Sequence, residues 1–473
     1  MSLSSPGIGS GLDVQGIVSQ LVAIEKKPLE NLKTQATSIQ TRLSTYGTIK
    51  SQFAALSDAA NQLSTVNRWN VFSATSSNTA AATVTATSSA TAGRLSLDVV
   101  RLAQSQSTSS AVIATDSAVG GGSMRIELGR WAAGVFTSNG TAAATVTIDP
   151  ADTITQVATK INQSNAGVTA TVLRDASGER LMVRSTATGE MQGFRIEVTD
   201  DDGSNTNNTG LSRLAYDTAA TGGMTLAQAG TNAEARINNV VISSATNRLN
   251  NTIPGLDITL AQVTTTPVDI NVQTDTEQLT TRIQAFVDAY NTLNNTLSNA
   301  LRYDPGTKTG GPLQGDSTTV GLQSALRAMM RSVSASTPFS RLLDIGIATQ
   351  PTGSGITLDK SKLSEAMATN LGGVRDLFTL TNNDQTLRGF GLKVKGFSDG
   401  VLNAGGTIDN KTRALELQRT RNQSEQDRVN DRAQRAERRL LSQFTKLDGM
   451  VAQYGALGNF VNQQLAIWNA QKS

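Results

Sequence analysis

Apolar residues between Asp13 and Leu63 recur at intervals of three and four, which is the spacing of one face of an α-helix. Asp13 is the expected N-cap of this segment, and Pro28 is expected either to end a first helix or to begin a second one. One extra three-residue step beside Gly47 interrupts the repeat, and such a stammer locally overwinds a coiled coil. The pattern predicts long helical structure that packs along other helices.

The pattern changes between Ser73 and Asp269, where short runs alternate apolar and polar residues. Small and polar residues dominate this segment, and turn signals such as Asp202-Gly203 separate the runs. One short helix is expected within it, with Ile154 and Ile161 on its apolar face. We predict about two small β-rich domains, with strands over residues 95–99, 124–128, 146–148, 168–172, 181–183, 196–198 and 258–260.

Helical spacing returns after Thr276. It forms one stripe from Leu279 to Leu297 and another in the last helix, from Val429 to Tyr454, with one stutter in the repeat. Both ends of the chain are therefore predicted to be helical, with β structure between them. Such apolar seams either assemble with other subunits or, alternatively, pair with each other in one compact helical domain that carries β inserts.

The fold class that follows is α+β multidomain: long terminal coiled-coil-type helices and a helical bundle domain, with two inserted β-rich domains. We expect four parts. They are a terminal helical domain (1–45 and 407–473), a helical bundle domain (46–75 and 273–406), a β-rich domain (76–102 and 188–272) and a second, inserted β-rich domain (103–187).

The composition removes most catalytic chemistry, because the 473 residues include no Cys and no His. Residues 310–317 have the glycine spacing of a phosphate loop, but Asp316 stands where a Lys would contact the phosphates. The run Asp200-Asp-Asp-Gly203 suggests a calcium loop, yet Val198 and Thr209 occupy its first and last ligand positions. We therefore expect no enzyme, no catalytic residue, no metal and no cofactor.

The charge pattern excludes two further classes of partner. Lys and Arg number 41 against 38 for Asp and Glu, and the basic stretch 411–439 intersperses acids and holds no aromatic residue, which favours a solvated coiled-coil face over a nucleic-acid site. The sequence contains no run of 18 consecutive apolar residues, so no membrane span is expected. The first residues lack the charged and apolar regions of a cleavable signal peptide.

Short motifs occur along nearly the whole chain. They are 7–13 (GIGSGLD), 17–21 (IVSQL), 28–29 (PL), 93–97 (GRLSL), 101–106 (RLAQSQ), 154–184, 235–239 (ARINN), 247–260, 312–317 (PLQGDS), 345–347 (IGI), 358–359 (LD) and 443–444 (QF). In this order they resemble the flagellar hook-associated protein 2 family. Two positions depart from the family pattern: Asn239 replaces the Gly of an Asn-Gly pair, and Gln314 replaces a Leu.

The resemblance implies a bacterial filament cap, which is a closed ring of identical subunits at the distal tip of the flagellum that promotes folding and insertion of exported flagellin. It implies as partners the chain itself, flagellin, the hook–filament junction proteins and a cytoplasmic export chaperone on the C-terminal helix, over residues 440–460. It also implies secretion through the flagellar export channel without a cleaved signal peptide.

Two apolar stripes are the expected assembly and partner-binding residues. Both alternate by three and four, so we expect them to pack against each other once the ring forms. They are Leu29, Leu32, Ile39 and Leu43 near the N-terminus, and Leu440, Phe444, Leu447 and Val451 near the C-terminus.

Three alternatives remain at this point. A secreted adhesin would bind host mucin or glycan through residues 73–269. A carboxylate-based glycosidase would need two carboxylates facing one cleft, and no spacing singles out such a pair. Flagellin itself or another axial junction protein would polymerise alone, whereas a cap would stop at a closed ring.

Overall fold

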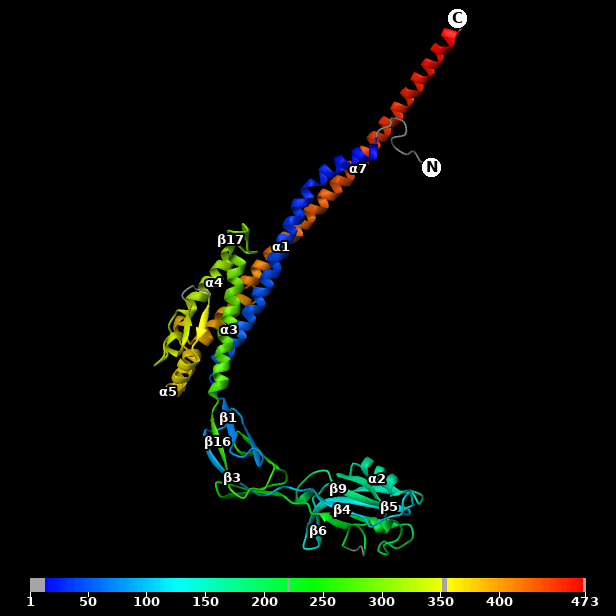
Figure 1. Ribbon diagram of the computed structural model, residues 1–473, viewed down its shortest axis with the longest axis vertical. Helices are drawn as coiled ribbons and strands as arrows, with labels where there is room; N and C mark the ends of the chain where they lie inside the picture. The colour runs from blue at the N-terminus through cyan, green and yellow to red at the C-terminus, as the bar shows by residue number, and fades with distance from the viewer. Residues whose placement is uncertain (1–12, 219–221, 351–354, 471–473) are drawn as a thin grey trace. The chain divides into compact units, whose positions relative to one another are not determined.

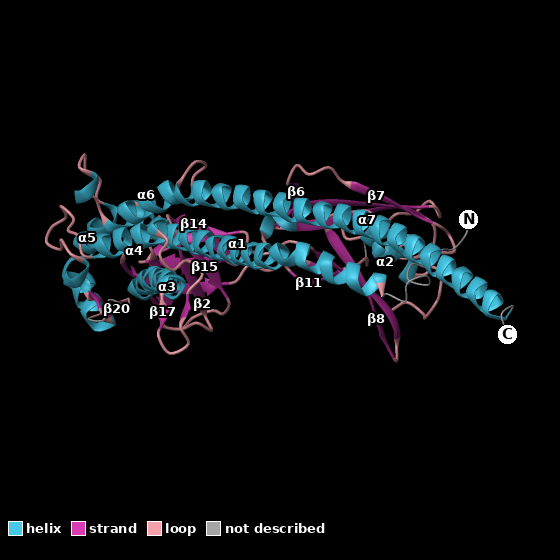
Figure 2. Cartoon of the chain, turned by 90° about the horizontal axis from the view of Figure 1, so that it is seen from above, coloured by secondary structure: helices cyan, strands magenta, loops and turns pink. Residues whose placement is uncertain are grey.

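The computed structural model describes residues 13–218, 222–350 and 355–470, with side chains described as far as residue 467. The chain divides into two compact units, one made of its two ends (Met1–Trp69 and Glu277–Ser473) and one made of its middle (Asn70–Thr276) (Figure 1). The first unit is mostly helical and the second mostly β-strand. Figure 2 colours the helices cyan and the strands magenta. The predicted α+β multidomain class is confirmed.

Long helices build the helical unit. They are α1 (Val14–Ser64), α3 (Thr276–Leu301), α4 (Ser317–Met330), α5 (Lys360–Thr379), α6 (Phe390–Leu402) and α7 (Thr407–Ala470). The shorter elements are the hairpins β17 (Tyr303–Asp304) with β18 (Thr309–Gly310) and β19 (Ile347–Thr349) with β20 (Ile356–Leu358), and the 3-10 turns η1 (Val66–Trp69), η4 (Leu342–Ile345) and η5 (Gln385–Leu387).

α1 is one continuous helix that contains Pro28. Asp13 caps it as predicted, because its Oδ1 accepts a hydrogen bond from the Gly16 amide at 2.8 Å. The predicted break at Pro28 is wrong. α1 is held against α7 on both sides of this residue, at Val22 and at Leu32, and this packing outweighs the ~3 kcal/mol that a Pro costs inside a helix.

Aromatic rings fill the core of the helical unit. Phe286 of α3 meets Phe378 of α5 edge-on with the ring centroids 6.2 Å apart, and Trp69 lies 5.7 Å from the same ring. Phe53 of α1 contacts Phe397 of α6 at 5.9 Å. The predicted apolar stripe of α3 is buried here, which confirms that its helical period faces other helices: Leu279, Ile283, Phe286, Val287, Tyr290, Leu293 and Leu297.

The described residues of the β unit form four antiparallel sheets of three strands or more. The five-stranded sheet has the order β1 (Phe72–Ser76), β16 (Val268–Thr274), β3 (Gly93–Arg101), β12 (Ala233–Ile237), β13 (Val240–Ser244), and the three-stranded sheet has the order β14 (Arg248–Ile253), β15 (Leu256–Leu260), β2 (Ala82–Ala86). The two four-stranded sheets contain β10 (Gly193–Asp200), β5 (Gly122–Ala132), β6 (Val135–Ser138) and β7 (Ala144–Ile148), and β11 (Thr225–Gln228), β4 (Ser107–Ser109), β9 (Gly178–Ser185) and β8 (Val168–Asp175).

Two separate apolar cores lie in this unit, as the sequence predicts. One joins residues 81–103 with 233–272, and the other joins residues 113–224. The cores do not divide at residues 187 and 188, where the sequence predicts a border. β10 pairs with β5 from Gly193 to Asp200, so that Phe194, Ile196 and Val198 enter the second core. The other domain borders stay predictions.

The expected helix of the β unit is α2 (Ile154–Gln163). Thr153 and Gln156 form a capping box at its start, where the Gln156 Oε1 accepts a hydrogen bond from the Thr153 amide at 2.8 Å. Ile154, Val157 and Ile161 are fully buried on its predicted apolar face. The helical period of this short segment is therefore confirmed.

The departure at Asn239 leaves its hairpin intact. Asn238 and Asn239 form a two-residue turn between β12 and β13, with φ angles of 48° and 67°. Asn tolerates this left-handed region better than most residues, although Gly is preferred there.

The acidic loop at residues 200–203 closes on itself. The Asp200 carboxylate accepts hydrogen bonds from the amides of Ser212 at 2.8 Å and Asp202 at 3.3 Å. The Asp202 carboxylate accepts one from the Ser204 amide at 2.8 Å. These carboxylates organise a turn, as expected from the poor match to a calcium loop.

Candidate assembly surface

The two ends of the chain pair with each other as antiparallel helices. Glu25 of α1 forms an ion pair with Arg432 of α7 at 3.5 Å, and the Asn422 Nδ2 donates to the Leu32 carbonyl at 3.0 Å. As the number rises along α1 it falls along α7, and the two ribbons follow each other over most of α1 (Figure 1). The alternative drawn from the sequence, in which the two ends pair, therefore describes the single chain.

A heptad repeat on α7 forms the seam of this pair. Every seventh side chain from residue 408 to residue 436 is buried. The facing apolar side chains of α1 are only half-buried, because two helices cover one side of a seam and leave the other open. The buried set on α7 is Ile408, Leu415, Asn422, Val429 and Ala436, and the half-buried set on α1 is Leu29, Leu32, Ile39 and Leu43.

The predicted pairing of the two apolar stripes is not the one formed within the chain. Leu440 and Phe444 pack instead against Val14, Val18 and Val22, near the start of α1. The antiparallel register causes this difference. Arg432 of α7 lies beside Glu25 of α1, so the residues of α7 after Arg432 lie beside residues of α1 that come before Glu25. Leu29, Leu32, Ile39 and Leu43 therefore face residues of α7 that come before Ala433, while Leu447 and Val451 are 43% and 39% exposed. Contacts between the two stripes of different subunits stay a prediction.

Asn422 places a polar layer in the middle of the apolar seam. Its Oδ1 accepts a hydrogen bond from the Gln426 Nε2 at 2.7 Å, and its Nδ2 bonds to the Leu32 carbonyl. A cavity of about 440 Å³ opens beside this layer, lined from α1 by Leu32 and Ile39 and from α7 by Gln418 and Asn422 among others. A single buried Asn fixes the register of a coiled coil at some cost in stability, and the seven-residue spacing from Ile408 is the signal that sequence reasoning missed.

We expect Asn422→Leu to stabilise the helix pair by about 1 kcal/mol and to loosen its register, because an apolar side chain removes the buried hydrogen bond from Asn422 to the Leu32 carbonyl. Since the chain has no Cys, register is measured by the rate of disulfide formation between paired substitutions. Glu25→Cys with Arg432→Cys reports the native register, and Glu25→Cys with Arg428→Cys reports a slip of about one turn. Val429→Leu is the control, which should leave the native pair dominant.

Asp316 ties three helices together next to the seam. Its Oδ1 accepts hydrogen bonds from the Tyr46 hydroxyl at 2.7 Å and from the Thr319 amide at 3.0 Å. Its Oδ2 lies 2.6 Å from the Lys411 Nζ and 3.4 Å from an Arg42 nitrogen. The side chain is 2% exposed, so α1, α4 and α7 meet at one buried carboxylate.

The electrostatics of this contact favour the charged carboxylate. Burial by itself raises the pKa of the Asp316 carboxyl, but the hydrogen bonds from Lys411, Tyr46 and the Thr319 amide outweigh it and hold that pKa well below its ordinary value. Burial also raises the pKa of the Tyr46 hydroxyl, which therefore stays a donor. The residue that excluded a phosphate loop is thus the N-cap of α4 and a clamp on the terminal helices.

The last part of α7 exposes an uncharged apolar stripe. Every side chain described from residue 449 to residue 467 is exposed, and none of these residues carries a charge. The exposed apolar residues recur at intervals of three and four along the helix, so most of them share one face. They are Leu447, Met450, Val451, Tyr454, Leu457, Phe460, Val461, Leu465 and Ile467, each 39% to 74% exposed.

The described ranges show neither an acidic metal cluster nor a membrane-spanning helix. Within residues 13–218, 222–350 and 355–470, no group of three or more acidic side chains is placed to hold a metal ion. Over the same ranges, every helix is too short or too polar to cross a membrane. Residues 7–12 of the first family motif (7–13) lie outside the described part of the chain, and only its last residue, Asp13, is described.

The fold and this surface define a two-unit protein with paired terminal helices, a β-rich middle and an exposed apolar stripe at one end of α7. Residues 10–106 match the flagellar hook-associated protein 2 N-terminus family, residues 230–456 the corresponding C-terminus family, and residues 135–187 the flagellin hook IN motif. The chain belongs to the flagellar hook-associated protein 2 family.

Similar proteins span the same length. The chain is 29% identical to flagellar hook-associated protein 2 of Escherichia coli K12 over 98% of both chains, and 28% identical to the B-type protein of Pseudomonas aeruginosa over 94% of both. Among solved structures, it resembles the D1-D2-D3 domains of the flagellar cap protein FliD from Escherichia coli, with a TM-score of 0.61 and 29% identity. That match covers 79% of this chain and 99% of the other.

Proposed function

We propose that this chain caps the flagellar filament. Copies assemble into a closed ring at the distal tip, and the ring promotes folding and insertion of exported flagellin subunits. The family membership and the similarity to a flagellar cap protein support this role. The structural observation that carries it is the exposed, uncharged apolar stripe on α7, because such a surface needs a partner in water.

The proposal gives each part of the helical unit a task. The seam and the Asp316 clamp hold the two chain ends in one register, so that α7 presents the stripe at a defined place. Neighbouring copies, flagellin or the junction proteins then cover it during assembly, and an export chaperone covers residues 440–460 before secretion. The proposed role is structural. It requires that the chain is secreted, without a cleaved signal peptide, and that it is located at the filament tip.

The stripe is tested with a matched pair of double variants in a strain that lacks its own cap gene. Leu457→Ser with Val461→Ser removes two large apolar side chains, each worth about 1.5–3 kcal/mol if buried at an interface. We expect few or short filaments and unpolymerised flagellin in the medium. Asn459→Ser with Gln463→Ser changes the opposite face of the same helix segment and should leave filaments normal.

Two measurements separate assembly from its alternatives. The amount of variant protein outside the cell shows whether export, and with it the chaperone contact, is intact. The mass of the purified oligomer shows whether a closed ring still forms. Filaments of normal length and number from a secreted Leu457→Ser, Val461→Ser variant would contradict the proposal. Binding of mucin or glycan by residues 73–269 stays a separate prediction.

A further inference from the structure

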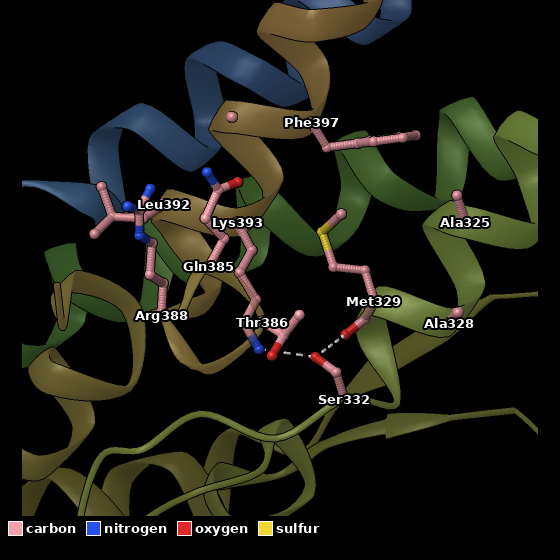
Figure 3. A pocket seen from close by; sticks show the side chains of 11 residues that line it. Ala325, Ala328, Met329, Ser332, Gln385, Thr386, Arg388, Leu392, Lys393 and Phe397 are labelled. Atoms are coloured by element: carbon pink, nitrogen blue, oxygen red, sulfur yellow. Dashed lines mark hydrogen bonds between the residues drawn. The ribbon is translucent and has the colours of Figure 1, made fainter. Parts of the chain in front are cut away.

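A groove in the helical unit lies away from the terminal seam. It has a volume of about 490 Å³ and runs between α4 and α6, with η5 at one end. Figure 3 shows the side chains that line it, with Met329 and Phe397 on facing sides and Lys393 reaching toward Ser332. The function proposed above does not use this groove.

The walls of the groove are low and its floor is apolar. Ala325 and Ala328 on α4 and Gly396 on α6 are exposed, so both helix backbones are open to a close approach. A Cβ atom at Gly396 would have no neighbour within 4 Å. Met329, Leu392 and Phe397 are half-buried between these walls. Two helices with small facing residues and an apolar floor form the kind of groove that receives the apolar face of a third helix.

Two cations, Lys393 and Arg388, lie at the rim, and neither forms an ion pair with a carboxylate among the described residues. The Lys393 Nζ donates to the Ser332 Oγ at 3.0 Å and to the Val333 carbonyl at 2.6 Å, and it lies 4.8 Å from the centre of the Phe390 ring. The Arg388 Nε donates to the Asn382 carbonyl at 2.8 Å. Among the residues that the structure describes, no Asp or Glu oxygen lies within 4.0 Å of either cation.

One carboxylate, Asp384, attracts Lys393 over a longer range without forming an ion pair with it. Asp384 caps η5 by accepting hydrogen bonds from the Thr386 amide at 2.9 Å and the Thr386 hydroxyl at 2.7 Å. Lys393 is half-buried, and this burial lowers the pKa of its ammonium group. Asp384 keeps its charge and offsets part of that of Lys393, so the two cations and one carboxylate leave the rim with a net positive charge.

We propose that this groove binds an amphipathic α-helix of a partner protein, one that carries carboxylates beside a stripe of large apolar side chains. The apolar stripe fills the space between Met329, Leu392 and Phe397, and the small residues of α4 and α6 let the partner helix approach. The carboxylates of the partner pair with Lys393 and Arg388. Charge complementarity favours an acidic helix over a basic one, because Lys393 and Arg388 attract carboxylates and repel other cations.

The test uses the full chain and two synthetic peptides as probes. Both are dye-labelled, helical and about 16 residues long, with a Leu stripe at intervals of three and four. One carries Glu at the positions that flank the stripe, and the other carries Lys there. Fluorescence anisotropy should show binding of the Glu peptide and at least about tenfold weaker binding of the Lys peptide.

Variants locate the binding in the groove. Ala328→Gln narrows it with a neutral, helix-forming side chain and should weaken binding of the Glu peptide about tenfold or more. Ser324→Gln places the same side chain on an exposed position of α4 outside the groove and should leave binding unchanged. Lys393→Met keeps the apolar stem, removes the charge and should reduce the preference for Glu over Lys.

Three results would overturn the proposal. The first is equal binding of the two peptides, and the second is binding of the Glu peptide that Ala328→Gln does not change. The third is a change in oligomer mass caused by Ala328→Gln, which would make the groove an interface between copies of this chain. The filament experiment with Leu457→Ser and Val461→Ser does not depend on any of these three results. The proposed capping function and the proposed helix-binding groove can therefore be disproved independently.

Discussion

Asp316→Ala is expected to lower the free energy of unfolding of the helical unit by about 3–5 kcal/mol at neutral pH. The change removes a buried carboxylate that accepts hydrogen bonds from Tyr46 and Thr319 and pairs with Lys411. It leaves the Lys411 ammonium close to a buried hydroxyl with no compensating charge, and it removes the N-cap of α4.

Denaturant unfolding of the full chain, followed by circular dichroism at a helical wavelength, measures this loss. Arg413→Ala is the control, because the Arg413–Asp409 pair is exposed and contributes about 0.5 kcal/mol or less. An Asp316→Ala chain that unfolds at the same denaturant concentration as the control would show that the clamp does not stabilise the unit.

The contacts of Asp316 also predict how the stability of the helical unit changes with pH. The pKa of the Asp316 carboxyl is lower in the folded chain than in the unfolded chain, where it is about 3.9. Its stabilising contribution is therefore complete at neutral pH, and it is lost as the pH falls below the unfolded pKa toward the folded one. The difference in stability between the natural chain and Asp316→Ala should shrink in that acidic window and stay constant from pH 6 to 8.

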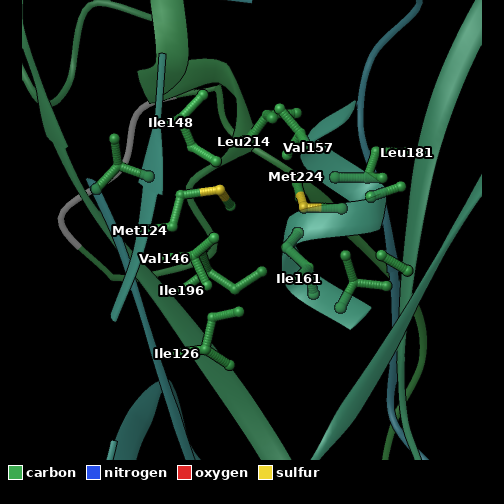
Figure 4. Packing of buried hydrophobic residues seen from close by; sticks show 14 of the residues in the cluster. Met124, Ile126, Val146, Ile148, Val157, Ile161, Leu181, Ile196, Leu214 and Met224 are labelled. Atoms are coloured by element: carbon green, nitrogen blue, oxygen red, sulfur yellow. The ribbon is translucent and has the colours of Figure 1, made fainter. Parts of the chain in front are cut away.

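Ile161→Ala is expected to destabilise the β unit by about 2–5 kcal/mol and to leave the helical unit unchanged. Ile161 is fully buried on α2, and its side chain points into the larger core of the β unit, as Figure 4 shows. Shortening Ile161 to Ala leaves a cavity in this core, and the core has few large aromatic rings that could move to fill the cavity.

Differential scanning calorimetry of the full chain measures the effect on each unit. The two units have separate cores, so Ile161→Ala should move the transition of the β unit and leave the helical transition in place. Gln163→Ala lies on the exposed face of the same helix and should move neither. A shift of both transitions by Ile161→Ala would show that the units unfold together.

The kind of each element was largely predictable from the sequence, because a hydrophobic period is carried by residues that are neighbours in the chain. The stripe on α3, the apolar face of α2 and the alternating strands β3, β5, β8 and β9 all follow their periods. The N-cap Asp13 also follows from its place before a helical repeat. Family motifs then indicated the class of protein, since they occur in order along most of the chain.

Contacts between distant residues could not be predicted in this way. Tyr46 and Asp316 are 270 positions apart, and Leu32 and Asn422 are 390 positions apart, so no local pattern indicates that they meet. The register of α1 on α7 depends on those contacts, and it places Leu440 and Phe444 on Val14–Val22 rather than on the expected stripe.

The sequence by itself thus determined the type of the segments with a clear hydrophobic period, that the ends are apolar seams and that Cys and His chemistry is absent. Short strands such as β4, β6 and β11 to β14 carry too few residues to show such a period and were not predicted. Only the tertiary structure decided that α1 continues through Pro28, that β10 joins the second β core and that Asp316 is a clamp. The physical reason is the same in each case. Local periodicity sets which face of an element is apolar, whereas packing against segments far along the chain sets what covers that face and outweighs local preference where the two conflict.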